Sequence, residues 1–166
     1  MGIAPLERTC VIYRNSSRGI FAALMLWLSA ALCGWADDET SVLIVVGAGG
    51  GTDYASAFGK WAANWQQACE TAGARAHTIG LDDQAEKSLE QLRTALDAER
   101  KDGDAELWLV LLGHGADDKF NLGGDDLAAS ELASLLKPFQ RPQILLNCFC
   151  VSGSLLAPLA APGRIV

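Results

Sequence analysis

A histidine and a cysteine each follow a hydrophobic run, and the two side chains could act together on a substrate. Gly113-His114-Gly115 comes directly after the apolar run 107–112, and Cys150 follows the run 144–147. A thiolate is a strong nucleophile, and a neighbouring histidine promotes its formation and can protonate a leaving group. If both runs are strands of one parallel sheet, their carboxyl ends line the same crevice. His114 and Cys150 therefore predict a cysteine hydrolase.

Other interpretations of the same residues stay open. Cys148 lies two residues before Cys150 and is a rival nucleophile, although no glycine-rich sequence directly follows it. Either thiol could be an inert core residue, because cysteine is often buried, or the two could form a local disulfide. Together with His114 they supply only three metal ligands, whereas a structural zinc site uses four. We therefore expect no metal and no cofactor.

The rest of the chain predicts an α/β fold, because apolar runs alternate with segments of helical periodicity. Strands joined by helices favour a parallel sheet with right-handed crossovers. The expected strands are 41–46, 74–79, 105–112, 143–147 and the start of a fifth at 163–166. The expected helices run from Asp53 to Gly73, from Asp82 to about Arg100, from Ser130 over a short apolar face, and over 152–159.

Local signals refine these elements. Asp53, Asp82 and Ser130 are expected to cap the amino ends of their helices, and Trp61 and Trp65 are expected in the core because they are four residues apart. Between 117 and 126, four aspartates flank an apolar-polar stretch that contains Gly123-Gly124. A solvated loop with a hairpin turn at the paired glycines is favoured there over a loop that faces substrate.

A glycine-rich segment, 47–52, follows the first expected strand and precedes a helix. It nearly matches a dinucleotide-binding fingerprint, but Thr52 stands where that pattern has glycine or alanine. Its acidic partner would have to be Asp82, just beyond the second strand. A nucleotide-binding module is thus a further hypothesis for the function, and a flexible loop at the rim of the crevice is favoured over it.

Length and charge narrow the possible partners. The 166 residues suit one domain, and a hydrophobic content of 50% is enough for a core. The formal net charge is −7 and no basic stripe is present, so nucleic acid is not an expected partner.

The amino terminus resembles a secretory signal. Three arginines precede the apolar run 20–32, and Gly34-Trp35-Ala36 offers small residues at the positions that a signal peptidase reads. Thirteen apolar residues are fewer than the ~20 that span a bilayer. We therefore expect a signal peptide over 1–36, a mature domain over 37–166 with no stable membrane span, and a location outside the cell, in the periplasm or in the cell envelope. An odd count of three cysteines in that domain predicts at least one free thiol.

Taken together, the strand, Gly113-His114-Gly115, the second strand and Cys150-x-Ser152-Gly153-Ser154 resemble the caspase-like cysteine peptidases, in particular the legumain and metacaspase branches. The similarity covers 42–166. It implies a three-layer fold, with a mainly parallel sheet between helices. It also implies that Cys150 is the nucleophile and His114 the catalytic histidine of an endopeptidase with a peptide or protein substrate. The oxyanion hole would be the backbone N–H groups of Gly115 and Cys150.

The chain also departs from that pattern. Cys148 stands where many relatives have an acidic or amide side chain, and Val151 where a polar residue is frequent. The sequence ends inside the fifth expected strand, so we expect a domain that is incomplete at its carboxyl end. A pseudo-peptidase, which keeps the fold and binds a protein without turnover, is the alternative function.

Overall fold

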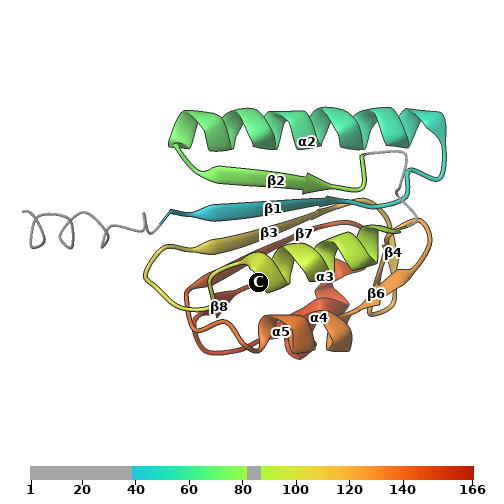
Figure 1. Cartoon of the computed structure of the whole chain (residues 1–166). Coiled ribbons are helices and arrows are strands. Elements are labelled where there is room, and N and C mark those ends of the chain that lie inside the picture. Colours follow the sequence, from blue (N-terminus) through green and yellow to red (C-terminus); the bar gives the residue numbers. More distant parts are fainter. Residues whose placement is uncertain (1–38, 82–86) are drawn as a thin grey trace, which may run out of the picture. The chain divides into compact units, whose positions relative to one another are not determined.

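A fully parallel five-stranded sheet organises the protein. The computed structural model describes residues 39–81 and 87–166, and in them the strand order is β2-β1-β3-β7-β8 (Figure 1). Each pair of neighbouring strands is parallel. The strands are β1 (Ser41–Val46), β2 (Arg75–Ile79), β3 (Leu107–Leu112), β7 (Gln143–Cys148) and β8 (Arg164–Ile165). The expected α/β class and all five expected strands are confirmed, although β3 begins two residues later than predicted.

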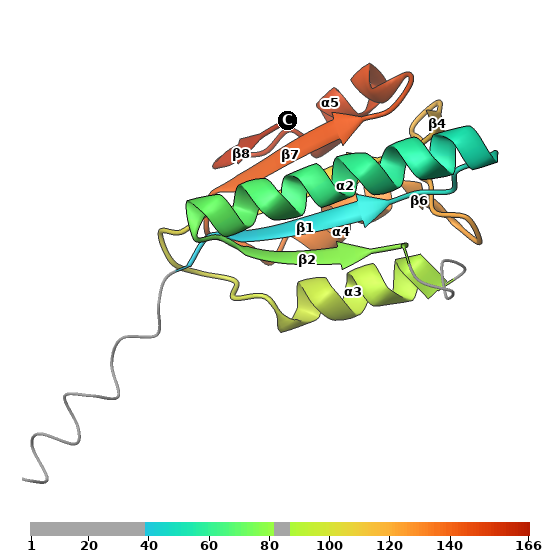
Figure 2. The ribbon, with the colours of Figure 1, turned by 90° about the horizontal axis from the view of Figure 1, so that it is seen from above.

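Helices cover both faces of this sheet and give a three-layer fold (Figures 1 and 2). One face carries α2, and the other carries α3, α4, the 3₁₀ helix η2 and α5. The bounds are α2 (Thr52–Ala72), α3 (Ser88–Ala98), α4 (Ala129–Leu136), η2 (Ser152–Leu155) and α5 (Leu156–Leu159). Because both faces are covered, the central strands β1 and β3 are almost entirely apolar rather than alternating with polar residues.

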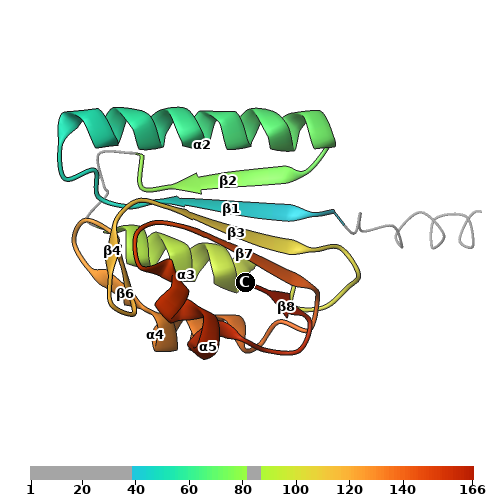
Figure 3. The same ribbon diagram turned by 180° about the vertical axis from the view of Figure 1, so that it is seen from behind.

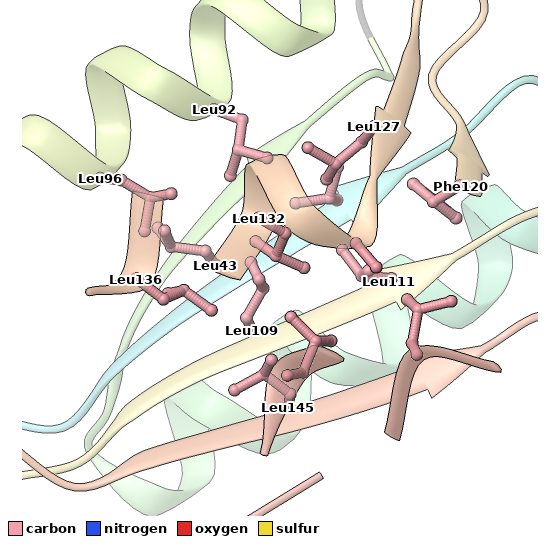
Figure 4. Close-up of a cluster of buried hydrophobic side chains, with 14 of the residues drawn as sticks. Leu43, Leu92, Leu96, Leu109, Leu111, Phe120, Leu127, Leu132, Leu136 and Leu145 are labelled. Atoms are coloured by element: carbon pink, nitrogen blue, oxygen red, sulfur yellow. The ribbon is translucent and has the colours of Figure 1, made fainter. Parts of the chain in front are cut away.

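Alternate residues of the central strands β1 and β3 enter two separate cores. In β1, Val42, Ile44 and Val46 pack with Phe58 and Ala62 of α2. The intervening Leu43 and Val45 pack on the other side with α3 and α4. Figure 4 shows this larger core, where leucines of α3 and α4 meet those of β1, β3 and β7. Its labelled members are Leu43, Leu92, Leu96, Leu109, Leu111, Phe120, Leu127, Leu132, Leu136 and Leu145.

The predicted end of α2 is confirmed and its predicted beginning is not. Gly73 ends the helix with φ 68°, and its backbone N–H donates to Glu70 O, which is the left-handed cap that glycine favours. At the other end Gly51 is the cap, in extended backbone and without a side-chain hydrogen bond. Asp53 therefore lies inside the first turn, where its carboxylate faces the positive end of the helix dipole. The predicted cap at Asp82 lies outside the described residues.

Two further expectations are wrong. Ala128, not Ser130, caps α4, because the Ala129 N–H donates to Asp118 O at 2.8 Å and so fixes where the helix begins. Trp61 is 46% exposed. The buried face of α2 is centred on Phe58, Ala62 and Cys69, and Trp61 lies at its edge, with its ring 5.5 Å from that of Phe58. Trp65 packs against the core as expected.

A small antiparallel sheet follows β3 directly. It contains β4 (Gly115–Ala116), β5 (Lys119–Asn121) and β6 (Asp126–Ala128), in that order. The hairpin expected at Gly123-Gly124 is present, with Gly123 at φ 95° and its N–H bonded to Asn121 Oδ1. The segment is more than a solvated loop, because Phe120, Leu122 and Leu127 are buried in the larger core.

An ion-pair network stabilises the end of the parallel sheet at which the strands begin. Glu99 accepts hydrogen bonds from Ser41 Oγ at 2.8 Å and from Arg75 Nη2 at 2.9 Å. Arg141, only 2% exposed, lies 3.6 Å from the same carboxylate and donates to the carbonyls of Ala105 and Glu106. Its guanidinium thereby links the segments that directly precede β3 and β7.

Candidate functional site

The strand order places three loops at one edge of the sheet. The chain moves from β1 to β2 on one side and then to β3, β7 and β8 on the other. A parallel sheet forms a ligand crevice at such a switch point, outside the carboxyl ends of the strands. The loops that follow β1, β3 and β7 lie at this edge, and Figure 3 shows β4 and β6 at the same end of the strands. Both candidate catalytic residues are in these loops.

His114 follows β3 and packs against the start of α2. Its ring makes edge contacts with the rings of Tyr54 and Phe58, with centroid distances of 4.9 and 5.2 Å. The imidazole is partly buried, and its backbone carbonyl accepts a hydrogen bond from the Asn121 N–H at 3.0 Å. The aromatic pair, one helical turn apart, therefore fixes the ring at the switch point.

Gly115 presents its backbone N–H away from β5. Gly115 lies opposite Phe120 in the antiparallel ladder. The neighbouring pair is His114 and Asn121, in which the Asn121 N–H donates a hydrogen bond to the His114 carbonyl. Antiparallel ladders alternate bonded and non-bonded pairs, so Gly115 is in a non-bonded pair. An N–H directed away from the partner strand is what the expected oxyanion hole requires at this position.

The glycine-rich segment after β1 is explained by contacts with its own chain. A Cβ on Gly47 would come 2.3 Å from Asn121 O, and one on Gly49 would come 2.6 Å from the Ala55 Cβ. Gly50 has φ 65° and lies against the His114 ring, since a Cβ there would be 3.8 Å from Nε2. Gly47 and Gly49 therefore allow β5 and α2 to approach closely, and Gly50 permits the positive φ beside His114.

The three cysteines of the described segment are free thiols. Cys69 is buried in α2, whereas Cys148 and Cys150 are exposed. Cys148 is the last residue of β7 and pairs in register with Leu112, so it faces the α2 side of the sheet. Desolvation by surrounding atoms raises the pKa of the Cys148 thiol despite this exposure. Cys150 lies in the turn just after the strand, and no local disulfide links it to Cys148.

The loops that carry His114 and Cys150 touch each other at two points. The Phe149 ring lies on Gly115, where a Cβ would be 2.3 Å from Phe149 Cδ2, and it also contacts the Phe120 ring at 5.1 Å. Ser154 Oγ makes a hydrogen bond to the carbonyl oxygen of Asp117. Residues beside each candidate catalytic side chain are therefore in direct contact across the two loops.

The candidate pair itself is not bonded. Within the described residues, no hydrogen bond joins His114 to Cys150 or to Cys148. A hollow of about 390 Å³ opens beside the histidine, and neither thiol lines it. Its lining residues are His114, Gly115, Ala116, Asp117, Lys119, Asn121 and Asp126. Both polar and apolar surface line the hollow, and two of its lining side chains approach each other, with Lys119 Nζ 4.0 Å from Asp126 Oδ2.

Several residues of this site were not anticipated from the sequence. The four-residue spacing of Tyr54 and Phe58 is typical of the buried face of a helix and gives no sign that their rings hold an imidazole. Phe149 lies between the two cysteines and belongs to no sequence pattern that predicts a contact with the His114 loop. Ser154 was the exception, because it closes the Cys-x-Ser-Gly-Ser pattern and could have been singled out there.

Comparisons with protein-family models, curated proteins and solved structures found no match to this chain. In the segments 39–81 and 87–166, no group of three or more histidine, cysteine or acidic side chains is arranged to hold a metal ion. No helix in the described part of the chain has both the length and the apolar character needed to cross a bilayer.

Proposed function

We propose that the protein is a cysteine-type endopeptidase in which Cys150 is the nucleophile and His114 the acid–base partner. The observation that carries this proposal is the contact between the two loops. His114 and Cys150 follow neighbouring parallel strands, β3 and β7, and Phe149 and Ser154 link the loops on either side of Cys150. The resemblance of both segments to caspase-like peptidases adds to this support.

The chemistry follows from the roles of these groups. The Cys150 thiolate attacks the carbonyl carbon of the scissile peptide bond and forms a tetrahedral intermediate. The N–H groups of Gly115 and Cys150 hold its oxyanion. His114 protonates the leaving amine, which yields a thioester acyl-enzyme, and water then hydrolyses that thioester. The hollow beside His114 has room for a substrate side chain.

The missing His114–Cys150 hydrogen bond does not exclude this chemistry. Catalytic hydrogen bonds are often long or misaligned in unliganded enzymes and tighten only when substrate binds. Because the histidine ring is held by Tyr54 and Phe58, we expect the Cys150 loop to be the part that adjusts. Cys150 itself is exposed, in a turn after β7.

Active-site labelling tests the proposal. The full chain would be treated in reducing buffer with a mixed panel of peptidyl acyloxymethyl ketones, and adducts located by peptide mass spectrometry. We expect one adduct, on Cys150, which is absent in Cys150→Ala and slowed in His114→Ala. Cys148→Ala is the matched control and keeps the adduct. Equal slow labelling of Cys148 and Cys150 in a folded sample would contradict the proposal.

A pseudo-peptidase is the second candidate, and one specific observation favours it. The His114 ring packs against two aromatic rings and bonds to neither thiol, which suits a structural histidine. An inert Cys150 in a stably folded protein, unaffected by His114→Ala, is the result expected of an interaction domain that keeps the fold without turnover.

We further infer that the protein is exported, on the signal-like sequence of 1–36, a segment that lies outside the described residues. Amino-terminal sequencing of the protein recovered from its native host tests this inference. A mature chain that begins at Asp37 is the expected result, and retention of Met1 would contradict it.

A further inference from the structure

Ser154 joins two strained backbone positions that lie far apart in the sequence. Asp117 and Val151 are the two non-glycine residues with positive φ in the described part of the chain, at 54° and 63°. Their carbonyl oxygens both accept from the hydroxyl of Ser154, and the distance to Val151 O is 2.9 Å. A hydroxyl has a single proton to donate, so it serves either carbonyl or is shared between them.

The left-handed conformation at these positions needs an external cause. Valine is β-branched and is a genuine outlier at positive φ, and its side chain, 62% exposed, gains little from core packing there. Such conformations persist only where the surroundings over-determine them, and they cluster at functional sites. The Ser154 N–H also donates to Val151 O, at 3.1 Å. Ser154 therefore supplies two of the contacts that stabilise the turn after Cys150.

These positions flank the candidate catalytic pair. Val151 directly follows Cys150, and Asp117 lies three residues after His114 at the tip of the β4–β5 hairpin. The hydrogen bond from Ser154 Oγ to Asp117 O joins the Cys150 turn to the His114 loop and so sets the distance between them. The Phe149–Gly115 contact fixes the same two loops from the strand side.

We propose that Ser154 is a positioning residue, whose hydroxyl ties the loop 113–117 to the turn 149–153 and so holds His114 and Cys150 in register. This inference rests on the proposed function and adds a residue to it. Ser154 touches neither the thiol nor the imidazole, and it acts through the backbone on either side of them.

Hydrogen exchange tests the tie without reference to catalysis. The full chain and its Ser154→Ala, Ser154→Thr and Ser152→Ala variants would be compared by mass spectrometry. Loss of one hydrogen bond of ordinary strength predicts about fivefold faster exchange over 113–121 in Ser154→Ala. Ser154→Thr keeps the hydroxyl, and Ser152 makes no side-chain hydrogen bond within the described residues. The exchange rates of Ser154→Thr and Ser152→Ala over 113–121 should therefore stay within about twofold of wild type. Unchanged exchange over 113–121 in Ser154→Ala would overturn the tie.

A double-mutant cycle tests the positioning role. The rate of Cys150 alkylation would be measured from pH 5 to 9 in wild type, His114→Ala, Ser154→Ala and the double variant. If Ser154 acts by positioning, Ser154→Ala loses the low-pH reactivity that depends on His114, and the double variant loses no more. Additive losses, with the His114-dependent part of the pH profile intact in Ser154→Ala, would overturn the positioning role.

The two hypotheses fail in different ways. If His114→Ala leaves the alkylation of Cys150 unchanged in the otherwise wild-type chain, the dyad is wrong and the positioning role falls with it. Faster exchange in Ser154→Ala would still support the tie between the loops in that case. If His114→Ala slows alkylation but Ser154→Ala does not, the dyad stands and the role of Ser154 is refuted.

Discussion

Replacing Gly115 with alanine should disturb the contact on which the candidate site depends. A Cβ at this position would lie 2.3 Å from Phe149 Cδ2, 2.5 Å from Phe149 Cε2 and 2.7 Å from Lys119 O. All three distances are far below van der Waals contact, and one of the atoms is backbone in a neighbouring strand, which cannot swing away. Overpacking of this kind costs about 1–3 kcal/mol.

Urea unfolding followed by tryptophan fluorescence measures this cost. We expect Gly115→Ala to lower the free energy of unfolding by about 2 kcal/mol, which corresponds to several degrees in the thermal midpoint. Gly153→Ala is the matched control: a Cβ there meets no atom within 4 Å and its φ is not positive. That variant should be neutral or slightly stabilising, because alanine restricts the unfolded chain.

A second variant identifies the clashing partner. If Phe149 is the main obstacle, Phe149→Ala should relieve part of the cost, so that the double variant is less destabilised than the sum of the two single variants. Gly115→Ala with the stability of Gly153→Ala would refute the packing argument. Strict additivity with Phe149→Ala would place the clash at Lys119 O instead.

Three further outcomes are expected. Glu99→Ala should lower the free energy of unfolding by about 3–5 kcal/mol in urea titrations, because Arg141 stays buried without its carboxylate; a loss below 1 kcal/mol would show that the pair is dispensable. Val151→Gly should raise that free energy by about 0.5–1 kcal/mol through relief of positive-φ strain, and a decrease would contradict the strain. Because the pKa of Cys148 is raised, its thiolate fraction at a given pH is lower than that of an ordinary thiol. Its iodoacetamide labelling, followed against pH in Cys150→Ala, should therefore have a midpoint above the value for glutathione, and a midpoint below it would contradict the desolvation.

The sheet was predictable because each strand carries its own signal. The runs 42–46 and 107–112 are apolar without interruption, as expected of strands covered on both faces. Gly73 marked the end of α2 because a left-handed cap favours glycine. The paired glycines at 123–124 likewise predicted the hairpin. In each case the deciding interaction is local, so the sequence alone contains it.

The site was only half predictable, for the opposite reason. Strand order placed His114 and Cys150 at one edge, but their neighbours come from tertiary packing. The edge contacts of Tyr54 with the imidazole depend on how α2 lies across the sheet. The start of α4 is set by a hydrogen bond from the Ala129 N–H to the Asp118 carbonyl. This tertiary contact outweighs the preference of serine for the capping position, which predicts a start at Ser130. No local pattern encodes such contacts.

The parallel arrangement of β1 has a consequence for synthesis and folding. Its two neighbours pair with it from far along the chain, since Ser41 aligns with both Arg75 and Leu107. The ribosome therefore synthesises Ser-Val-Leu-Ile-Val-Val well before either partner strand. A run of six uncharged β-prone residues without proline is prone to intermolecular aggregation while it is unpaired. Asp38 and Glu39 lie just before this strand. Their negative charges directly flank the apolar run, where charge opposes intermolecular aggregation until β2 and β3 have been synthesised and can pair with β1.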